Sequence, residues 1–129
     1  MATILIVEDD EDTREALRDV LANEGFDVRA SPGAREAIAE VSRPDAPGLV
    51  LLDATMPGMS GAELLDWMGK RKQLDKIPVV LVSADTTCPV HERAVELLRK
   101  PYDLEDLLRV ARRFCAPERG RPAEAAQKS

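Results

Sequence analysis

Five polar side chains stand at or shortly after the ends of short apolar runs in this chain: Glu8, Asp9, Asp53, Ser83 and Lys100. Apolar runs that alternate with amphipathic helices are typical of a parallel sheet, in which the carboxyl ends of the strands share one edge. Residues that are far apart in the sequence are therefore expected to converge there. Carboxylates, a hydroxyl and a cation in one pocket would suit a hard metal ion and a phosphoryl group.

The carboxylates have the chemistry of a magnesium site. Mg²⁺ prefers oxygen ligands in octahedral geometry, usually one or two carboxylates with backbone oxygen, phosphate and water. Asp9 and Asp53 are the expected carboxylate ligands, with Glu8 acting directly or through a water, and Mn²⁺ is an alternative ion. Carboxylates that are packed together repel each other, so a bound cation would also stabilise the fold.

Asp53 is, in addition, the expected nucleophile, because a carboxylate can attack phosphorus and form an aspartyl phosphate. Lys100 would pair with the phosphoryl oxygens as a point charge. Ser83 would donate a hydrogen bond to one of these oxygens, so its position would depend on whether phosphate is present. That dependence would make the site a switch.

The strands expected to position these residues cover residues 3–7, 26–30, 49–53, 78–82 and 95–98. Capping residues and apolar stripes predict helices that begin near Asp12, Ser31, Ser60 and Asp103. This alternation, together with right-handed crossovers, favours an α/β fold of three layers (α/β/α) with a flavodoxin-like, doubly wound, five-stranded parallel sheet of order 2-1-3-4-5. The first and third strands are neighbours in that order, which would place Asp9 beside Asp53.

Length and composition describe a single folded domain with a net charge of −6. The acidic excess argues against direct nucleic-acid binding, which depends on Lys and Arg. A membrane span would need about 18 consecutive apolar residues, and the sequence has no such stretch and no signal-peptide pattern. Two cysteines do not make a disulfide framework, which favours a cytoplasmic location. Residues 1–116 are expected to fold, and residues 117–129 to form a disordered tail.

These motifs resemble the receiver domain of two-component response regulators. The resemblance covers residues 3–115 and rests on four motifs in the family's order: Glu8-Asp9, the segment from Asp53 to Gly61, Ser83-Ala84 and Lys100-Pro101. It implies a regulatory domain rather than an enzyme, with only self-catalysed phosphoryl transfer and slow autodephosphorylation. It also implies a histidine kinase or histidine phosphotransfer protein as donor, and an unknown downstream protein partner.

The resemblance assigns a role to each matching residue. Asp53 would be the phosphoacceptor, Asp9 a metal ligand, and Glu8 a support for the metal site. Thr55 would contribute its backbone carbonyl to the metal. Ser83 would be the switch hydroxyl, and Lys100 would contact the phosphate and be followed by a cis bond to Pro101.

Two features depart from the family pattern. Lys100 follows Ser83 by only 17 positions, where receivers usually have a longer interval that holds a complete helix. The short interval predicts that this helix is stunted or replaced by a loop. Leu97 stands where the family usually has an aromatic residue. Both changes affect the face that receivers use to signal, so we expect phosphorylation without the ordinary coupling between that aromatic and the hydroxyl.

Other functions fit the sequence less well. A receiver-like interaction module that no longer uses phosphorylation would agree with the short interval but not with the intact acids and Lys100. An aspartyl-phosphate phosphohydrolase usually carries a second acid two residues after the nucleophile, where this chain has Thr55. Flavodoxin-like cofactor binding would need a phosphate-binding loop, rich in hydroxyl residues and glycine, after the first strand, and this sequence has no such loop there. The motifs do not identify the kinase, the pathway, the output, the oligomeric state or a larger parent protein.

Overall fold

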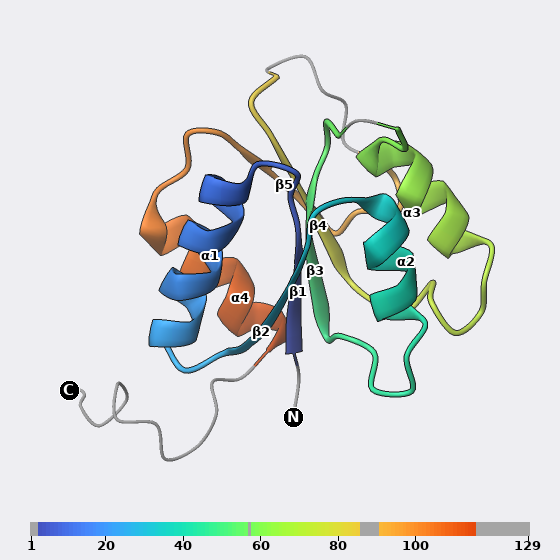
Figure 1. The fold of residues 1–129 in the computed structure, drawn as a ribbon, viewed down its shortest axis with the longest axis horizontal. Coiled ribbons are helices and arrows are strands. Elements are labelled where there is room, and N and C mark those ends of the chain that lie inside the picture. The colour runs from blue at the N-terminus through green and yellow to red at the C-terminus, as the bar shows by residue number, and fades with distance from the viewer. Residues whose placement is uncertain (1–2, 57, 86–90, 116–129) are drawn as a thin grey trace.

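The computed structural model describes residues 3–56, 58–85 and 91–115, which form a parallel sheet covered by helices on both faces (Figure 1). The strands are β1 (Thr3–Val7), β2 (Asp27–Ser31), β3 (Leu49–Asp53), β4 (Val79–Ser83) and β5 (Glu96–Arg99). The helices are α1 (Glu11–Asn23), α2 (Ala34–Val41), α3 (Gly61–Gly69) and α4 (Leu104–Phe114). The strand order is β2-β1-β3-β4-β5, which confirms the predicted flavodoxin-like topology.

The helices α1 and α4 lie on one face of the sheet and α2 and α3 on the other (Figure 1), and the sheet separates two apolar clusters. Side chains alternate between the faces of a strand, so each strand contributes to both clusters. Leu5 and Leu52 lie in the cluster under α2 and α3, while Ile4 and Leu51 lie in the cluster under α1 and α4. The aliphatic residues of β3 are at most 2% exposed, as expected for a central strand covered on both faces.

The register of the strands aligns their carboxyl ends. Val7 of β1 pairs with Leu52 of β3, and Asp53 pairs with Val82 of β4. The backbone N–H of Lys100 then donates to the carbonyl of Ser83 over 2.8 Å. The residues that follow β1, β3, β4 and β5 therefore lie along one edge of the sheet.

Two helix starts differ from the sequence predictions. Asp12 was expected to cap the first helix, but Asp10 does so, and its Oδ2 accepts hydrogen bonds from the backbone N–H and the hydroxyl of Thr13. Ser31 was expected to cap the second helix, but it ends β2 and Gly33 occupies the N-cap of α2. The prediction for Ser31 was wrong because strand pairing with β1 outweighed its local capping preference.

The connection between β4 and β5 has no helix in its described residues, 84–85 and 91–95. The prediction of an altered connection is confirmed for these residues; residues 86–90 lie outside the described part. Leu97, which the resemblance led us to expect in place of an aromatic, is half-buried against the cluster under α2 and α3.

Side-chain contacts, rather than helix packing, attach the end of this connection to the body of the domain. His91 Nε2 lies 2.8 Å from Asp66 Oδ1 on α3, and His91 Nδ1 accepts a hydrogen bond from the backbone N–H of Arg93. The Arg93 guanidinium donates to the carbonyls of Leu74 (2.7 Å) and Ile77 (3.3 Å). These contacts hold residues 91–93 against α3 and the loop that follows it.

None of the described helices has the length and apolarity needed to span a lipid bilayer. The predicted domain end at residue 116 and the predicted disordered tail at 117–129 lie outside the described residues.

Candidate functional site

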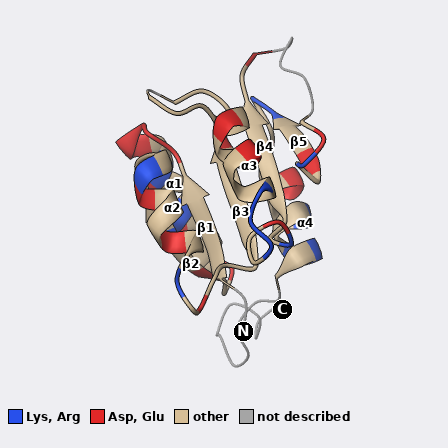
Figure 2. Ribbon diagram, turned by 90° about the vertical axis from the view of Figure 1, so that its right-hand side faces the viewer, with Lys and Arg blue, Asp and Glu red and all other residues tan. Residues whose placement is uncertain are grey.

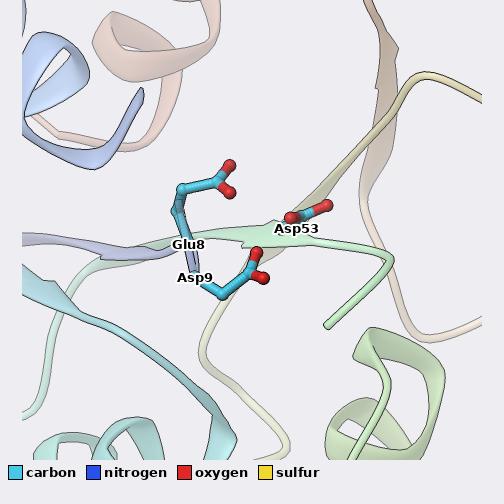
Figure 3. A group of neighbouring side chains, drawn as sticks. All are labelled: Glu8, Asp9 and Asp53. Atoms are coloured by element: carbon cyan, nitrogen blue, oxygen red, sulfur yellow. The ribbon is translucent and has the colours of Figure 1, made fainter. Parts of the chain in front are cut away.

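The sheet edge brings three of the predicted site residues together. Glu8 and Asp9 follow β1, Asp53 ends β3, and each places a carboxylate oxygen within 4.8 Å of those of the other two (Figure 3). We call these three residues the acidic cluster. Oxygen atoms at this spacing, from a buried, an exposed and a half-buried side chain, suit a small divalent cation such as Mg²⁺. The cluster therefore fits the metal that the sequence predicted.

Glu8 is the buried member of the cluster. Its side chain is 6% exposed, and its Oε2 accepts a hydrogen bond of 3.1 Å from the backbone N–H of Asp10. Burial, followed by repulsion from Asp53, raises the pKa of Glu8 from 4.5 to about 7, although the hydrogen bond from Asp10 and the charge of Lys100 oppose the shift. At neutral pH, Glu8 is therefore close to the point at which it releases its proton.

Lys100 supplies the cation of the site. Its Nζ lies 3.6 Å from Glu8 Oε1, and its side chain is 31% exposed. The Lys100–Pro101 bond is cis, as the resemblance implied. The lysine thus contacts the acidic cluster on one side and remains accessible to an anion from solvent.

The remaining predicted residues lie at the same edge. Asp53 Oδ1 accepts a hydrogen bond of 3.2 Å from the backbone N–H of Thr55, which holds the carboxylate at the start of the loop after β3. Ser83 is 2% exposed, and its Oγ accepts a hydrogen bond of 3.0 Å from the backbone N–H of Asp85. Because Oγ accepts this bond through a lone pair, the hydroxyl proton of Ser83 remains available for donation to another acceptor. The metal-binding role of the Thr55 carbonyl stays a prediction.

Sequence reasoning missed two side chains that belong to this site. Arg14 on α1 donates from Nη1 to the carbonyl of Glu8 over 3.0 Å and so holds the backbone of the cluster. Tyr102 is half-buried, and burial together with the negative charges of Glu8 and Asp53 raises the pKa of its hydroxyl. Arg14 lies in a helix that looks regular in sequence, so only the fold could reveal its contact.

Gly61 allows a close approach that the site requires. A Cβ atom at Gly61 would lie 2.9 Å from the carbonyl oxygen of Asp53 and 3.0 Å from the Cα of Ala54. The N–H of Gly61 donates to the carbonyl of Ala54 over 3.2 Å. The start of α3 is thus packed directly against the backbone of Asp53 and Ala54. Its capping box, formed by Ser60 and Glu63, is confirmed as predicted.

We expect Gly61→Ala to destabilise the protein by about 1–3 kcal/mol, because backbone atoms cannot move away as a flexible side chain would. The matched control is Gly69→Ala, whose Cβ would meet only the side chain of Arg93 at 3.4 Å. Replacing this helical glycine should be neutral or stabilise by up to about 1 kcal/mol. Urea unfolding followed by circular dichroism measures both, and equal stabilities for the two variants would contradict the prediction.

The raised pKa of Glu8 predicts that metal binding at the acidic cluster depends on pH. Below about pH 7 the folded protein holds a proton on Glu8 that a metal must displace, so Mg²⁺ affinity should be about tenfold weaker at pH 6 than at pH 8. In the absence of metal, the unfolded chain loses this proton near pH 4.5 while the folded chain keeps it to about pH 7. Stability of the metal-free protein should therefore fall as the pH rises through that window.

Isothermal titration with Mg²⁺ at both pH values measures this effect, and Glu8→Gln is the control variant. The variant should bind Mg²⁺ more weakly but with little change between pH 6 and pH 8. A wild-type affinity that is the same at both pH values would show that Glu8 does not contribute to the metal site.

Comparison with known proteins identifies relatives over nearly the whole described chain. The family model of the response regulator receiver domain matches residues 4–112. An uncharacterized 14.6 kDa protein of Leptolyngbya boryana is 32% identical over 117 residues, which cover 87% of this chain and 88% of that protein. The sensory transduction protein RegX3 of Mycobacterium tuberculosis is 33% identical over 113 residues, which cover 84% of this chain but only 48% of RegX3.

Solved structures agree with the match to the receiver-domain family. The response regulator protein TrrA of Thermotoga maritima, solved in complex with Mg²⁺-BeF, superposes with a TM-score of 0.78 at 27% identity and covers 89% of this chain and 100% of that one. The Vibrio cholerae chemotaxis protein CheY4 superposes with a TM-score of 0.79 at 25% identity, covering 89% of this chain and 99% of that one. Unlike the Leptolyngbya protein, curated relatives such as RegX3 are about twice as long as this chain or longer, so the chain spans about half of their length or less.

Proposed function

Because the chain belongs to the response regulator receiver domain family, we propose that it is a signalling module controlled by phosphorylation of Asp53, within a two-component system. The observation that carries this proposal is the acidic cluster beside Lys100: three carboxylates within 4.8 Å of one another and an ammonium group 3.6 Å from one of them. Transfer of a phosphoryl group to Asp53 needs both features. The carboxylates provide the nucleophile and the ligands for a metal ion, and positive charge is needed because the nucleophile and the transferred group are both anionic.

The acidic cluster, with the carbonyl of Thr55, would hold Mg²⁺. When bound, this ion supplies positive charge that offsets the repulsion between the carboxylates and the phosphoryl oxygens. The same residues then have separate tasks. Glu8 and Asp9 would bind the metal ion. Asp53 lies at the end of the central strand and would present its carboxylate as the nucleophile.

In the transfer step, an oxygen of Asp53 attacks the phosphorus of a phosphohistidine on the donor protein. An O–P bond forms as the P–N bond breaks, and the electron pair stays on the imidazole nitrogen, which then takes up a proton. Lys100 stabilises the charge on the equatorial phosphoryl oxygens. Ser83, one strand away, would donate its hydroxyl proton to the phosphoryl group once it is attached to Asp53.

This chain has a surface next to Lys100 to which the donor protein could bind. A groove of about 500 Å³ lies between α1 and α4 and reaches Lys100 and Tyr102 at its end. Its lining is largely apolar, and Leu104, which is 50% exposed, stands at its rim. We propose that a helix of a histidine kinase or phosphotransfer protein packs into this groove, in the cytoplasm, and brings its histidine to Asp53.

The altered connection between β4 and β5 supports one alternative, an interaction module that does not depend on phosphorylation. The described part of this connection has no helix, and Leu97 replaces the aromatic of the family. The two functions differ in a simple measurement. A functional receiver binds Mg²⁺ and becomes phosphorylated, whereas the alternative module binds its partner equally well with Asp53 unmodified.

Intact-mass spectrometry after incubation with acetyl phosphate tests the proposal. We expect a mass increase of one phosphoryl group when Mg²⁺ is present and none when the ion is chelated. The absence of an increase, together with absent Mg²⁺ binding in isothermal titration, would refute the proposal and favour the alternative module.

A further inference from the structure

The edge of the sheet opposite the acidic cluster carries a concentration of positive charge. The loop between α3 and β4 contains Lys70, Arg71, Lys72 and Lys76 within seven residues, in a chain whose net charge is −6. All four are exposed. Figure 2 shows this basic loop, residues 70–76, after α3 with its Lys and Arg residues in blue; the loop also contains one acid, Asp75. The loop enters β4 from its amino end and is therefore separated from the acidic cluster by the length of the sheet.

In the basic loop, Arg71 is held by Trp67, whereas Lys70, Lys72 and Lys76 extend into solvent. Within the described part of the chain, the basic loop takes part in no ion pair, whereas Arg29, Arg43 and Arg109 each pair with one or more acids. Lys70 and Arg71 lie at the carboxyl end of α3, where positive charge favours the helix dipole. That local role does not account for Lys72 and Lys76, which lie farther along the loop.

A preformed hollow lies beside the basic loop. It has a volume of about 560 Å³ and lies between the α2–β3 connection and the end of α3. Val41, Pro44, Ala46, Trp67 and Leu74 provide apolar lining, and Arg43 and Arg71 provide charge. We call this hollow the basal groove.

Trp67 and Arg71 give the basal groove a fixed wall. The Arg71 guanidinium lies 3.8 Å from the centroid of the Trp67 ring, and its Nη1 donates to the carbonyl of Trp67 over 2.9 Å. Trp67 also packs against the apolar cluster under α2 and α3. These three contacts limit the movement of the two side chains, so a ligand would meet an already ordered surface.

We propose that the basal groove binds an acidic peptide segment of a partner protein, with an apolar side chain in the groove and carboxylates on the basic loop. Charge complementarity carries the choice of ligand: the exposed lysines of the basic loop, which form no ion pair within the described residues, lie beside an apolar depression lined by Arg43 and Arg71, in a protein with a net charge of −6. The proposed phosphorylation site lies at the opposite edge of the sheet, so this binding does not depend on it.

Two other anionic partners fit the surface less well. Nucleic acid would stack bases on an aromatic ring, but Trp67 is occupied by Arg71 and by the core. A membrane would need protruding apolar side chains, and the large exposed ones in the described residues, Val95 and Leu104, lie elsewhere.

The test uses a fluorescein-labelled peptide of Asp and Glu residues around one leucine, measured by fluorescence anisotropy against the full chain. Trp67 is the only tryptophan, so its emission reports directly on occupation of the groove. We expect Lys70→Gln with Lys72→Gln to weaken binding about tenfold. Arg18→Gln with Arg112→Gln removes the same charge from the opposite face of the sheet and should change binding by about twofold or less.

Asp53→Asn should bind the peptide as wild type does, so failure of the proposed function would leave this result unchanged. The proposal is overturned if the acidic peptide does not bind, or if both double variants lose affinity equally. It is also overturned if a single-stranded oligonucleotide or anionic vesicles bind more tightly than the peptide. Self-association that sedimentation shows to depend on Lys70 and Lys72 would likewise replace the peptide with a second copy of the chain.

Discussion

Asp53→Asn is expected to abolish the mass increase with acetyl phosphate, because an amide oxygen is a far weaker nucleophile than a carboxylate. The side chain keeps its size, so the fold should persist. Mg²⁺ affinity should fall too, since one of three clustered carboxylates is lost. Intact-mass spectrometry and isothermal titration measure these two effects separately.

The same substitution should make the metal-free protein more stable. Asp53 contributes to the raised pKa of Glu8 through repulsion and a hydrogen bond, and an uncharged side chain removes that repulsion. Asp19→Asn, an exposed residue of α1 with the same change of charge, is the matched control and should behave as wild type. Phosphorylation of the Asp53→Asn protein at the wild-type level would show that another residue is the acceptor.

Lys100→Met is expected to reduce the rate of phosphorylation about 100-fold at saturating Mg²⁺. Methionine has nearly the volume of the lysine stem but cannot stabilise charge on the phosphoryl oxygens, and losing one such group commonly costs a factor of about 100–1,000. Lys100 also lowers the pKa of Glu8. Its removal should therefore raise that pKa above about 7 and weaken Mg²⁺ binding at neutral pH.

Saturating Mg²⁺ separates the two roles of this lysine. If Lys100 acted only through Glu8, excess metal would restore the rate of the variant, whereas direct contact with the phosphoryl group predicts a deficit that metal cannot overcome. Lys72→Met makes the same change at the opposite edge of the sheet and should leave the rate unchanged. A wild-type rate for Lys100→Met at saturating Mg²⁺ would exclude the proposed contact.

The sequence by itself determined the fold and the edge of the sheet at which the acidic cluster lies. The uninterrupted apolar run that ends in Asp53 identified a central strand, and the alternation of strands and helices was sufficient for the sheet order. Once that order is known, Glu8, Asp9 and Asp53 must meet, because parallel strands place their carboxyl ends together. These conclusions depend only on periodicity and topology, which the chain encodes locally.

Local capping signals were wrong at Asp12, where the nearby Asp10 is the cap, and at Ser31, where long-range strand pairing competed with them. The capping box at Ser60 and the cap at Asp103 formed as predicted. Ser31 did not cap a helix, because β1 pairs with β2 through that residue and the N–H of Glu8 donates to its carbonyl. The strand contact joins segments that are far apart in sequence, so a local pattern could not reveal it.

Only the tertiary structure decided how the site behaves. The burial of Glu8, the distance from Glu8 to Lys100, and the backbone approach at Gly61 all depend on atoms from several elements. The anchoring of residues 91–93 by Asp66 and by the carbonyls of Leu74 and Ile77 likewise joins distant segments. A pKa or a contact of this kind reflects desolvation and distance in three dimensions, and neither quantity is encoded in the spacing of residues along the chain.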